Sequence, residues 1–252
     1  MLRPELVTLY KYLPISEHSI TALRTRAFWF ANPRSFNDPF DCALAVAEDG
    51  LRDSVEHALS TITSSPRYVP GSIPAERLKP DSHDAEAFAT FREGVGRVFE
   101  EMGLLCLTES CDNLLMWGHY SSSHTGICVG FERSPTNMVG RLAHAVTYRR
   151  EYPRLTLADF ERTLNPNSVD QLWLTKASDW SYEREWRLVA NPGNRSYGID
   201  ACVTQLVFGV RTSDDDRRRV LDAVIAGGHD PALKRAVPAP DRFAVHLEDL
   251  RV

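Results

Sequence analysis

Short runs of apolar residues recur along the whole chain and predict strands from its beginning to its end. Residues 103–108 and 126–131 are almost entirely apolar, which is typical of strands buried on both faces of a sheet. Shorter apolar runs, or an alternation of apolar and polar residues with period two, indicate further strands. These are expected at residues 7–12, 27–30, 145–149, 205–210 and 243–247.

Helical spacing of apolar residues predicts helices between these strands. From Asp84 onward the apolar side chains recur every three or four residues and predict a helix with one core-facing stripe. The stripe consists of Phe88, Phe91, Val95, Val98, Phe99 and Met102. Further helices are expected after the capping residues Ser16, Asn113 and Ser213. Helical segments are also expected at residues 51–62, 157–164 and 169–177.

Local strand pairs and strand–helix alternation occur together, which predicts a single α+β domain over residues 1–252. We expect its central sheet to be mixed or antiparallel, with flanking helices. Residues 64–83 interrupt the pattern with several serines and with prolines at 66, 70, 74 and 80. This composition predicts a long surface loop or a mobile lid.

Composition narrows the class of protein. The chain of 252 residues is 43% hydrophobic and 25% charged, as in soluble globular proteins, and its net charge of −5 argues against non-specific nucleic-acid binding. No apolar run is long enough to span a bilayer and no leader pattern opens the chain, so no membrane association and a cytoplasmic location are expected. The five cysteines are scattered without a C-x-x-C pair, and predict neither a disulfide framework nor a zinc site.

The stretch from Lys176 to Val189 carries the strongest candidate chemistry. If it is a strand, Glu183, Glu185 and Arg187 share one face, because side chains alternate with period two. We therefore expect these three residues to point into one cleft, with Lys176 as a second cation nearby.

The aromatic residues of this stretch support a site. Tyr182 and Trp186 are expected to turn to the opposite side of the strand. A solvated strand face with a local ion pair would explain the charges alone. Trp180, Tyr182 and Trp186 favour a site instead, because flat aromatic walls suit a planar ligand.

A polar loop at residues 32–41 contains two Pro, two Asn and two Asp. Asn37 and Asp38 can build a rigid turn by bonding to their own backbone, or can form one wall of a ligand cleft. We expect Lys11 and residues 37–41 to line the same cleft as Glu185.

A cluster of His119, Tyr120 and His124 lies among three serines between the two buried strands. Two histidines five residues apart are not a metal-ligand signature. His124 is expected to be either a base or ligand-binding group, or a structural histidine with its hydrogen bonds satisfied. The roles of these three residues stay open, and no metal ligand is predicted.

Several motifs together resemble the bacterial domain-of-unknown-function family numbered 2971, over nearly the whole chain. They are L-Y-K-Y (9–12), F-N-D-P-F-D (36–41), L-C-L-T (105–108), L-M-W-G-H-Y (115–120), H-T-G-I-C-V-G-F (124–131) and K-x-x-x-W-S-Y-E-R-E-W-R (176–187). This resemblance names no activity.

A second resemblance does imply an activity. The E-x-E motif, the Tyr-containing first strand and the aromatic residues are similar to mono-ADP-ribosyltransferases, which consume NAD. Carried over, Glu185 would be the catalytic carboxylate beside the nicotinamide ribose, and Glu183 would orient the acceptor. Tyr10, Lys11 and Tyr12 would stand where that superfamily grips NAD with Arg or His, and no Ser-Thr-Ser strand is present. The remaining expected NAD-binding residues are Asn37, Asp38, Trp180 and Arg187.

This resemblance predicts an NAD-consuming transferase or glycohydrolase of the toxin or defence type. Its acceptor would be a protein or a nucleic acid, and a neutralising partner protein would be expected. One alternative is a non-catalytic nucleotide-binding module with a structural polar network of Lys11, Asn37, Asp38, Lys176, Glu183, Glu185 and Arg187. A weaker alternative is a metal-dependent nuclease that uses Asp38, Asp41, Lys176, Glu183 and Glu185.

Overall fold

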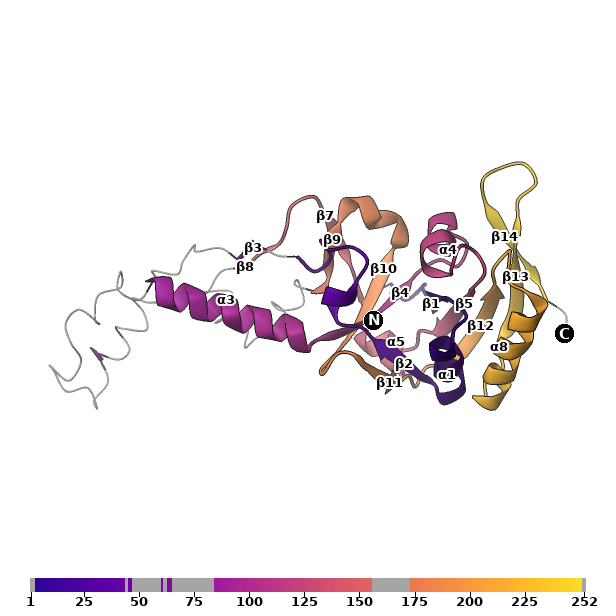
Figure 1. Cartoon of the computed structure of the whole chain (residues 1–252), viewed down its shortest axis with the longest axis horizontal. Coiled ribbons are helices and arrows are strands. Elements are labelled where there is room, and N and C mark those ends of the chain that lie inside the picture. The colour runs from indigo at the N-terminus through magenta and orange to yellow at the C-terminus, as the bar shows by residue number, and fades with distance from the viewer. Residues whose placement is uncertain are drawn as a thin grey trace.

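The chain folds around one eight-stranded sheet with the strand order β14-β13-β12-β5-β1-β4-β10-β6 (Figure 1). The computed structural model describes residues 3–43, 45–46, 60, 63–64, 84–155 and 173–250. Strands β12 and β13 are parallel, and the other neighbours are antiparallel. The strands are β1 (Thr8–Leu13), β4 (Gly103–Thr108), β5 (Ile127–Glu132), β6 (His144–Ala145), β10 (Glu185–Ala190), β12 (Val203–Phe208), β13 (Ala232–Pro238) and β14 (Val245–Asp249). The predicted α+β class with a mixed sheet is confirmed.

Three two-stranded sheets surround the large one. Strand β2 (Ala27–Phe30) pairs antiparallel with β11 (Arg195–Gly198). Strand β3 (Ala45–Val46) pairs parallel with β8 (Arg154–Leu155), and β7 (Thr147–Arg149) pairs parallel with β9 (Thr175–Ala177).

The predicted capping residues begin three of the helices. Ser16, Asn113 and Ser213 each accept a hydrogen bond from the first turn of the helix that follows. The helices are α1 (Glu17–Thr25), α3 (Asp84–Glu101), α4 (Leu114–Tyr120), α5 (Met138–Leu142) and α8 (Asp214–Ala226), with 3-10 turns η1 (Pro33–Ser35) and η4 (Ser178–Glu183). None of the helices in the described ranges is long and apolar enough to cross a membrane.

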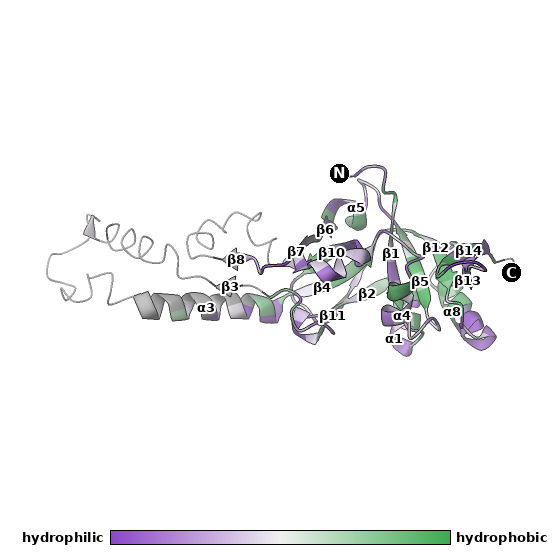
Figure 2. Ribbon diagram, turned by 90° about the horizontal axis from the view of Figure 1, so that it is seen from above, coloured by the Kyte–Doolittle hydropathy of each residue, from purple (hydrophilic) through white to green (hydrophobic). Residues whose placement is uncertain are grey.

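Helix α3 projects away from the large sheet, as both Figure 1 and Figure 2 show. It confirms the helix expected from Asp84. Of its predicted stripe, the side chains of Phe88, Phe91, Val95 and Val98 lie outside the described part, whereas Phe99 packs edge-on against Trp173.

The sheet buries two apolar clusters, one on each face. Helices α1 and α8 cover the first cluster, which includes Leu9 of β1 and Val129 of β5. Helix α4 covers the second, which includes Tyr12 and Cys128 from the same two strands. The alternation of side chains along β1 and β5 distributes them between the two faces. Figure 2 shows β5 and β12 as the apolar centre of the sheet.

The sheet divides between its neighbouring strands β1 and β4. These strands share one register pair, Tyr10 with Thr108, whereas β1 pairs with β5 along its full length and β4 with β10 along its full length. Near the beginning of β4, Leu104 exchanges two backbone hydrogen bonds with Ala31 instead of with β1. The two strands therefore diverge from the Tyr10–Thr108 pair towards Leu13 of β1 and Leu104 of β4, and leave a fork inside the sheet.

Several expectations about the elements were wrong. Residues 175–177 form strand β9 and not a helix end, and residues 182–188 are not one strand. Arg184 has a left-handed backbone (φ 45°), which ends η4 and starts β10, so period-two alternation does not extend back to Glu183. The segment 145–149 is divided between β6 and β7, and α5, β11 and β13 were not foreseen.

Some expectations fall outside the described residues. These are the helix at 157–164, nearly all of the helix at 51–62 and of the loop or lid at 64–83, and the part of the helix at 169–177 that precedes Trp173.

Candidate functional site

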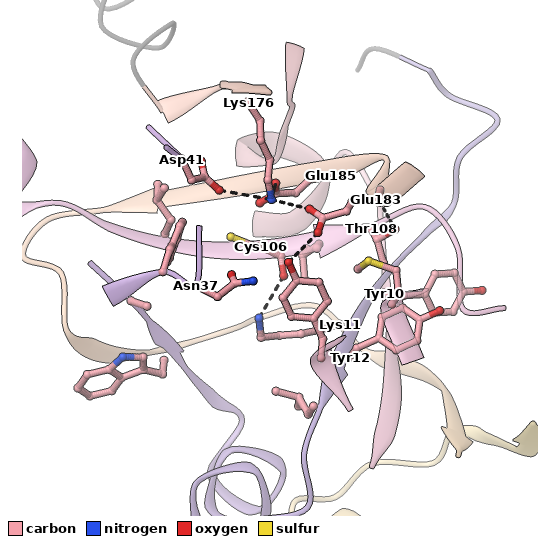
Figure 3. A pocket seen from close by; sticks show the side chains of 18 residues that line it. Tyr10, Lys11, Tyr12, Asn37, Asp41, Cys106, Thr108, Lys176, Glu183 and Glu185 are labelled. Carbon is pink, nitrogen blue, oxygen red and sulfur yellow. Dashed lines mark hydrogen bonds and ion pairs between the residues drawn. The ribbon is translucent and has the colours of Figure 1, made fainter. Parts of the chain in front are cut away.

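A cavity of about 310 Å³ lies in the fork between β1 and β4 (Figure 3). Side chains of both parities from both strands line it, as expected for a space between strands and not on one face of a sheet. The lining residues are Tyr10, Lys11, Tyr12, Leu13, Trp29, Ala31, Phe36, Asn37, Asp41, Leu104, Cys106, Leu107, Thr108, Met116, Tyr120, Lys176, Glu183 and Glu185.

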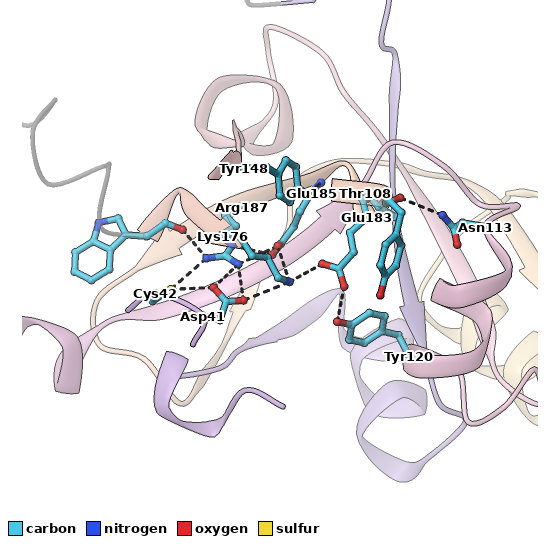
Figure 4. A network of polar contacts seen from close by, with 12 residues as sticks. Asp41, Cys42, Thr108, Asn113, Tyr120, Tyr148, Lys176, Glu183, Glu185 and Arg187 are labelled. Carbon is cyan, nitrogen blue, oxygen red and sulfur yellow. Dashed lines mark hydrogen bonds and ion pairs between the residues drawn. The ribbon is translucent and has the colours of Figure 1, made fainter. Parts of the chain in front are cut away.

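Lys176 holds three carboxylates together at the wall of this cavity (Figure 4). Its Nζ lies 2.5 Å from Glu183 Oε2, 3.2 Å from Glu185 Oε2 and 3.3 Å from Asp41 Oδ2. All four side chains are almost completely buried. A buried charge is stable only when it is paired, so these residues form one electrostatic unit.

Arg187 completes this unit from behind the cavity wall. Its Nε donates to Glu185 Oε1 at 2.8 Å, and its Nη2 donates to both carboxylate oxygens of Asp41 at 2.8 Å. Its Nη1 donates to the backbone oxygen of Trp173 at 2.6 Å. We call Asp41, Lys176, Glu183, Glu185 and Arg187 the ion cluster. With all five ionised, three carboxylates face two cations, which leaves one net negative charge.

The two glutamates of the ion cluster differ in their affinity for protons. Burial by itself would raise the pKa of Glu185, but Arg187 and Lys176 lower it to about 2. For Glu183, burial prevails over the effect of Lys176 and raises the pKa above its ordinary value. Burial would lower the pKa of Lys176, but the three carboxylates raise it well above its ordinary value. Glu185 is therefore an anion at neutral pH, and Glu183 is the more readily protonated of the two glutamates.

Glu183 is positioned by residues of other elements. Tyr120 of α4 donates its hydroxyl proton to Glu183 Oε1 at 2.6 Å. The Thr108 hydroxyl donates to the backbone oxygen of Glu183 at 2.5 Å. The end of η4 is thereby tied to the point where β1 and β4 still pair.

Lys11 is the other lysine of the cavity and has a different environment. Its Nζ donates to the backbone oxygen of Cys106 at 3.1 Å. Because β4 has left β1 at this point, the lysine replaces a strand partner for that oxygen. Burial lowers the pKa of Lys11 below its ordinary value, although Cys106 and Glu185 act in the opposite direction.

The structure brings most of the predicted NAD-binding residues to one place. Tyr10, Lys11, Tyr12 and Asn37 line the cavity together with Glu183 and Glu185. Arg187 does not line it and supports Glu185 from behind. Asp41 lines it as well, so residues of the 37–41 loop share the cavity with Lys11.

Besides Arg187, two further predicted binding residues do not line the cavity. Asp38 accepts a hydrogen bond from the backbone of Phe40 and builds the turn, which is the structural alternative for this residue. Trp180 lies beside the ion cluster, with its ring centroid 5.2 Å from Lys176 Nζ. Trp186 packs into the first apolar cluster and Tyr182 against the second.

Sequence reasoning did not single out Trp29, Phe36 or Thr108 as site residues, yet all three line the cavity. Trp29 offered a usable signal, because it lies between the inward-facing Phe28 and Phe30 and must face outward. It is 48% exposed.

Of the residues with open roles, Tyr120 belongs to the site and the two histidines do not line it. His119 contacts the rings of Tyr120 and Trp180. His124 stacks on Trp117, and burial together with Arg211 lowers its pKa.

The described ranges contain no group of three or more His, Cys, Asp or Glu side chains that could hold a metal ion. Of the four carboxylates named for a nuclease, Asp41, Glu183 and Glu185 are instead bridged by the ammonium group of Lys176.

Fold and site together define an α+β protein with a divided mixed sheet and a charged, aromatic-lined cavity in the division. Residues 116–188 match the family described as "Protein of unknown function (DUF2971)", in support of the resemblance for that part of the chain. These residues include most of α4, all of β5 and the whole ion cluster except Asp41. No curated protein and no solved structure matches the chain.

Proposed function

We propose that the cavity binds NAD and breaks the bond between nicotinamide and ribose, with transfer to an acceptor or to water. One observation carries the proposal. The first strand, with Tyr10, Lys11 and Tyr12, faces the same cavity as Glu183 and Glu185, although β4 lies between β1 and β10. The resemblance to ADP-ribosyltransferases requires this juxtaposition, and it arises here because the sheet divides.

The electrostatics suit the reaction. Positive charge develops on the ribose as nicotinamide leaves, and a fixed carboxylate beside it stabilises the transition state. Glu185 is ionised at neutral pH because its pKa is about 2. The ion cluster retains one net negative charge when all its members are ionised, so its anions are not fully neutralised by Lys176 and Arg187.

The size and walls of the cavity fit one part of NAD. A volume of about 310 Å³ is at the small end of ligand pockets, which typically hold ~300–1,000 Å³. It suits the nicotinamide and its ribose, with the adenosine half outside. Trp29, Phe36 and the three tyrosines at 10, 12 and 120 supply flat surfaces for a planar ring.

The test is nicotinamide release from NAD by the purified chain. Glu185→Gln is nearly isosteric and should reduce release by ~100-fold, because it removes one preorganised stabilising charge. Glu183→Gln should retain slow hydrolysis and reduce transfer to protein or nucleic-acid acceptors. Glu248→Gln, at an exposed ion pair on β14, is the matched control and should change neither rate.

Two outcomes would count against the proposal. Absence of release by the wild type, with and without acceptors, would exclude NAD cleavage under those conditions. Release that persists in Glu185→Gln would contradict the role assigned to that residue.

The second candidate is a non-catalytic nucleotide-binding module. It is favoured by the number of contacts to Glu185, whose two oxygens accept from Arg187 and Lys176 as in a structural ion pair. In that case neither glutamine variant alters any turnover, and both lower the melting temperature because a buried cation loses its partner.

A further inference from the structure

Lysine is scarce in this chain, and its placement is uneven. The lysines are Lys11, Lys79, Lys176 and Lys234, among 29 Lys and Arg residues. Lys11 and Lys176 line the same cavity. Most positive charges of the chain are arginines, and two of its four lysines border this one cavity. Lysine differs from arginine in that its amine can lose its proton and act as a nucleophile when it is buried.

The two cavity lysines have opposite surroundings. Lys176 contacts three carboxylates within 3.3 Å, which hold its proton in place. Within the described part of the chain, no carboxylate lies at ion-pair distance from Lys11, and its hydrogen bond goes to the neutral backbone oxygen of Cys106. Figure 3 shows Lys11 apart from the ion cluster, with Asn37 between them in the view.

The fork explains why Lys11 is accessible to a ligand. Leu9 and Leu13, two residues before and after it on β1, pack into or against the first apolar cluster. Lys11 occupies the same parity but lies where β4 has moved away, so its amine borders the cavity and not the packed core. Burial of the charged form favours the neutral amine, in agreement with the lowered pKa of this group.

We propose that Lys11 is a reactive amine that forms an imine with the aldehyde carbon of a sugar ligand held in the cavity. The identity of that ligand rests on the proposed function, since cleavage of NAD by water yields ADP-ribose, whose open-chain form carries an aldehyde at C1. The neutral Nζ attacks C1 and a carbon–nitrogen double bond forms. The carbonyl oxygen leaves as water with both hydrogens of the amine, so no oxidant or reductant is consumed. Water reverses the reaction.

The imine can be trapped without any NAD cleavage. The purified full chain is incubated at neutral pH with ADP-ribose and cyanoborohydride, which reduces an imine to a stable amine. Peptide mass spectrometry then locates the adduct. We expect the adduct at Lys11 ahead of the partly exposed Lys234, which pairs with Asp249, and none at the buried Lys176.

Variants separate reactivity from charge. Lys11→Arg retains a cation but cannot form an imine, so the main adduct should disappear. Lys234→Arg is the matched control and should leave the Lys11 adduct unchanged. If Lys11→Arg does not fold, as judged by circular dichroism, the peptide map of the wild type still decides the question.

An adduct mainly at Lys79, Lys176 or Lys234, or none on any lysine with ADP-ribose in excess, would overturn the inference. The inference and the proposed function fail separately. Trapping at Lys11 without nicotinamide release from NAD would support the reactive amine and contradict the proposed cleavage activity. Nicotinamide release without trapping would support the cleavage activity and contradict the reactive amine.

Discussion

At the scale of single residues, Arg187 is the part of the site whose loss should be most damaging. Its guanidinium is fully buried and pairs with Asp41 and Glu185. Lys176 would remain as their other cation, but it already serves Glu183 as well. Arg187 therefore decides whether the carboxylates can stay ionised inside the protein.

We predict that Arg187→Met lowers the free energy of unfolding by ~3–5 kcal/mol, because it leaves buried carboxylates insufficiently paired. Arg235→Met is the matched control, since Arg235 pairs with Glu248 at the surface and such pairs contribute only ~0–1 kcal/mol. Urea unfolding of both variants measures the difference. Equal losses in the two variants would show that the buried cluster is not electrostatically critical.

The pKa of Glu185 also predicts a dependence of stability on pH. Its value of about 2 in the folded protein lies below the ordinary value that the unfolded chain restores. The stabilisation is therefore complete above that ordinary value and is lost as the pH falls from it towards 2. Glu183 has a raised pKa, so its effect on the pH dependence of stability has the opposite sign.

We expect the urea midpoint of the wild type to fall between pH 4.5 and 2 more steeply than that of Glu185→Gln, which lacks the titrating group. Glu183 has a raised pKa and therefore changes stability mainly above its ordinary value of 4.5, outside this interval. Parallel curves for the two proteins would mean that Glu185 has an ordinary pKa in the folded state.

At the scale of elements, α4 links the cavity to the turn that carries Glu183. Asn113 caps α4 by accepting from the backbone N–H of Leu115 at 2.9 Å and of Met116 at 3.3 Å. The Asn113 side chain also donates to the backbone oxygen of Tyr182 in η4 at 3.0 Å. One side chain thus joins two elements that both contribute to the cavity wall.

We predict that Asn113→Ala lowers the free energy of unfolding by ~2 kcal/mol, because the cap and a bond to another element are lost together. Ser213→Ala is the control at the N-terminus of α8, where the serine bonds only within its own helix, and should cost ~1 kcal/mol. Urea unfolding compares them. An equal cost would mean that the bond to η4 adds nothing.

At the scale of the whole molecule, the eight-stranded sheet draws on segments from Thr8 to Asp249. The first apolar cluster joins α1 and α8 across the strands between them. Strands from both ends of the chain contribute to the buried clusters, Leu9 of β1 to the first and Val245 of β14 to the second, so the domain should unfold as one unit.

We expect coincident urea transitions from far-UV circular dichroism and from the fluorescence of the tryptophans, of which Trp117 and Trp186 are buried in different apolar clusters. Two separated transitions would show that the two faces of the sheet are independently stable.

Most of the local elements could be predicted from the amino-acid sequence alone. The caps at Ser16, Asn113 and Ser213 were predictable because a side chain bonds to a backbone only two or three residues away. The buried strands β4 and β5 were predictable because burial on both faces demands continuous apolar residues. That Lys176, Glu183, Glu185 and Arg187 lie near one another could also be inferred from their concentration in one stretch, although their contacts could not.

The contacts among those residues depend on the folding of distant segments and could not be predicted. Strand parity predicted that Glu183 and Glu185 lie together, but the alternation is interrupted at Arg184, which has a left-handed backbone. The two glutamates meet because η4 and β10 both bring their carboxylates to Lys176. Asp41 reaches Arg187 across 146 positions of sequence, and the cavity exists because β1 and β4 diverge. Such contacts are set by the packing of distant segments around a shared core, which no local periodicity encodes.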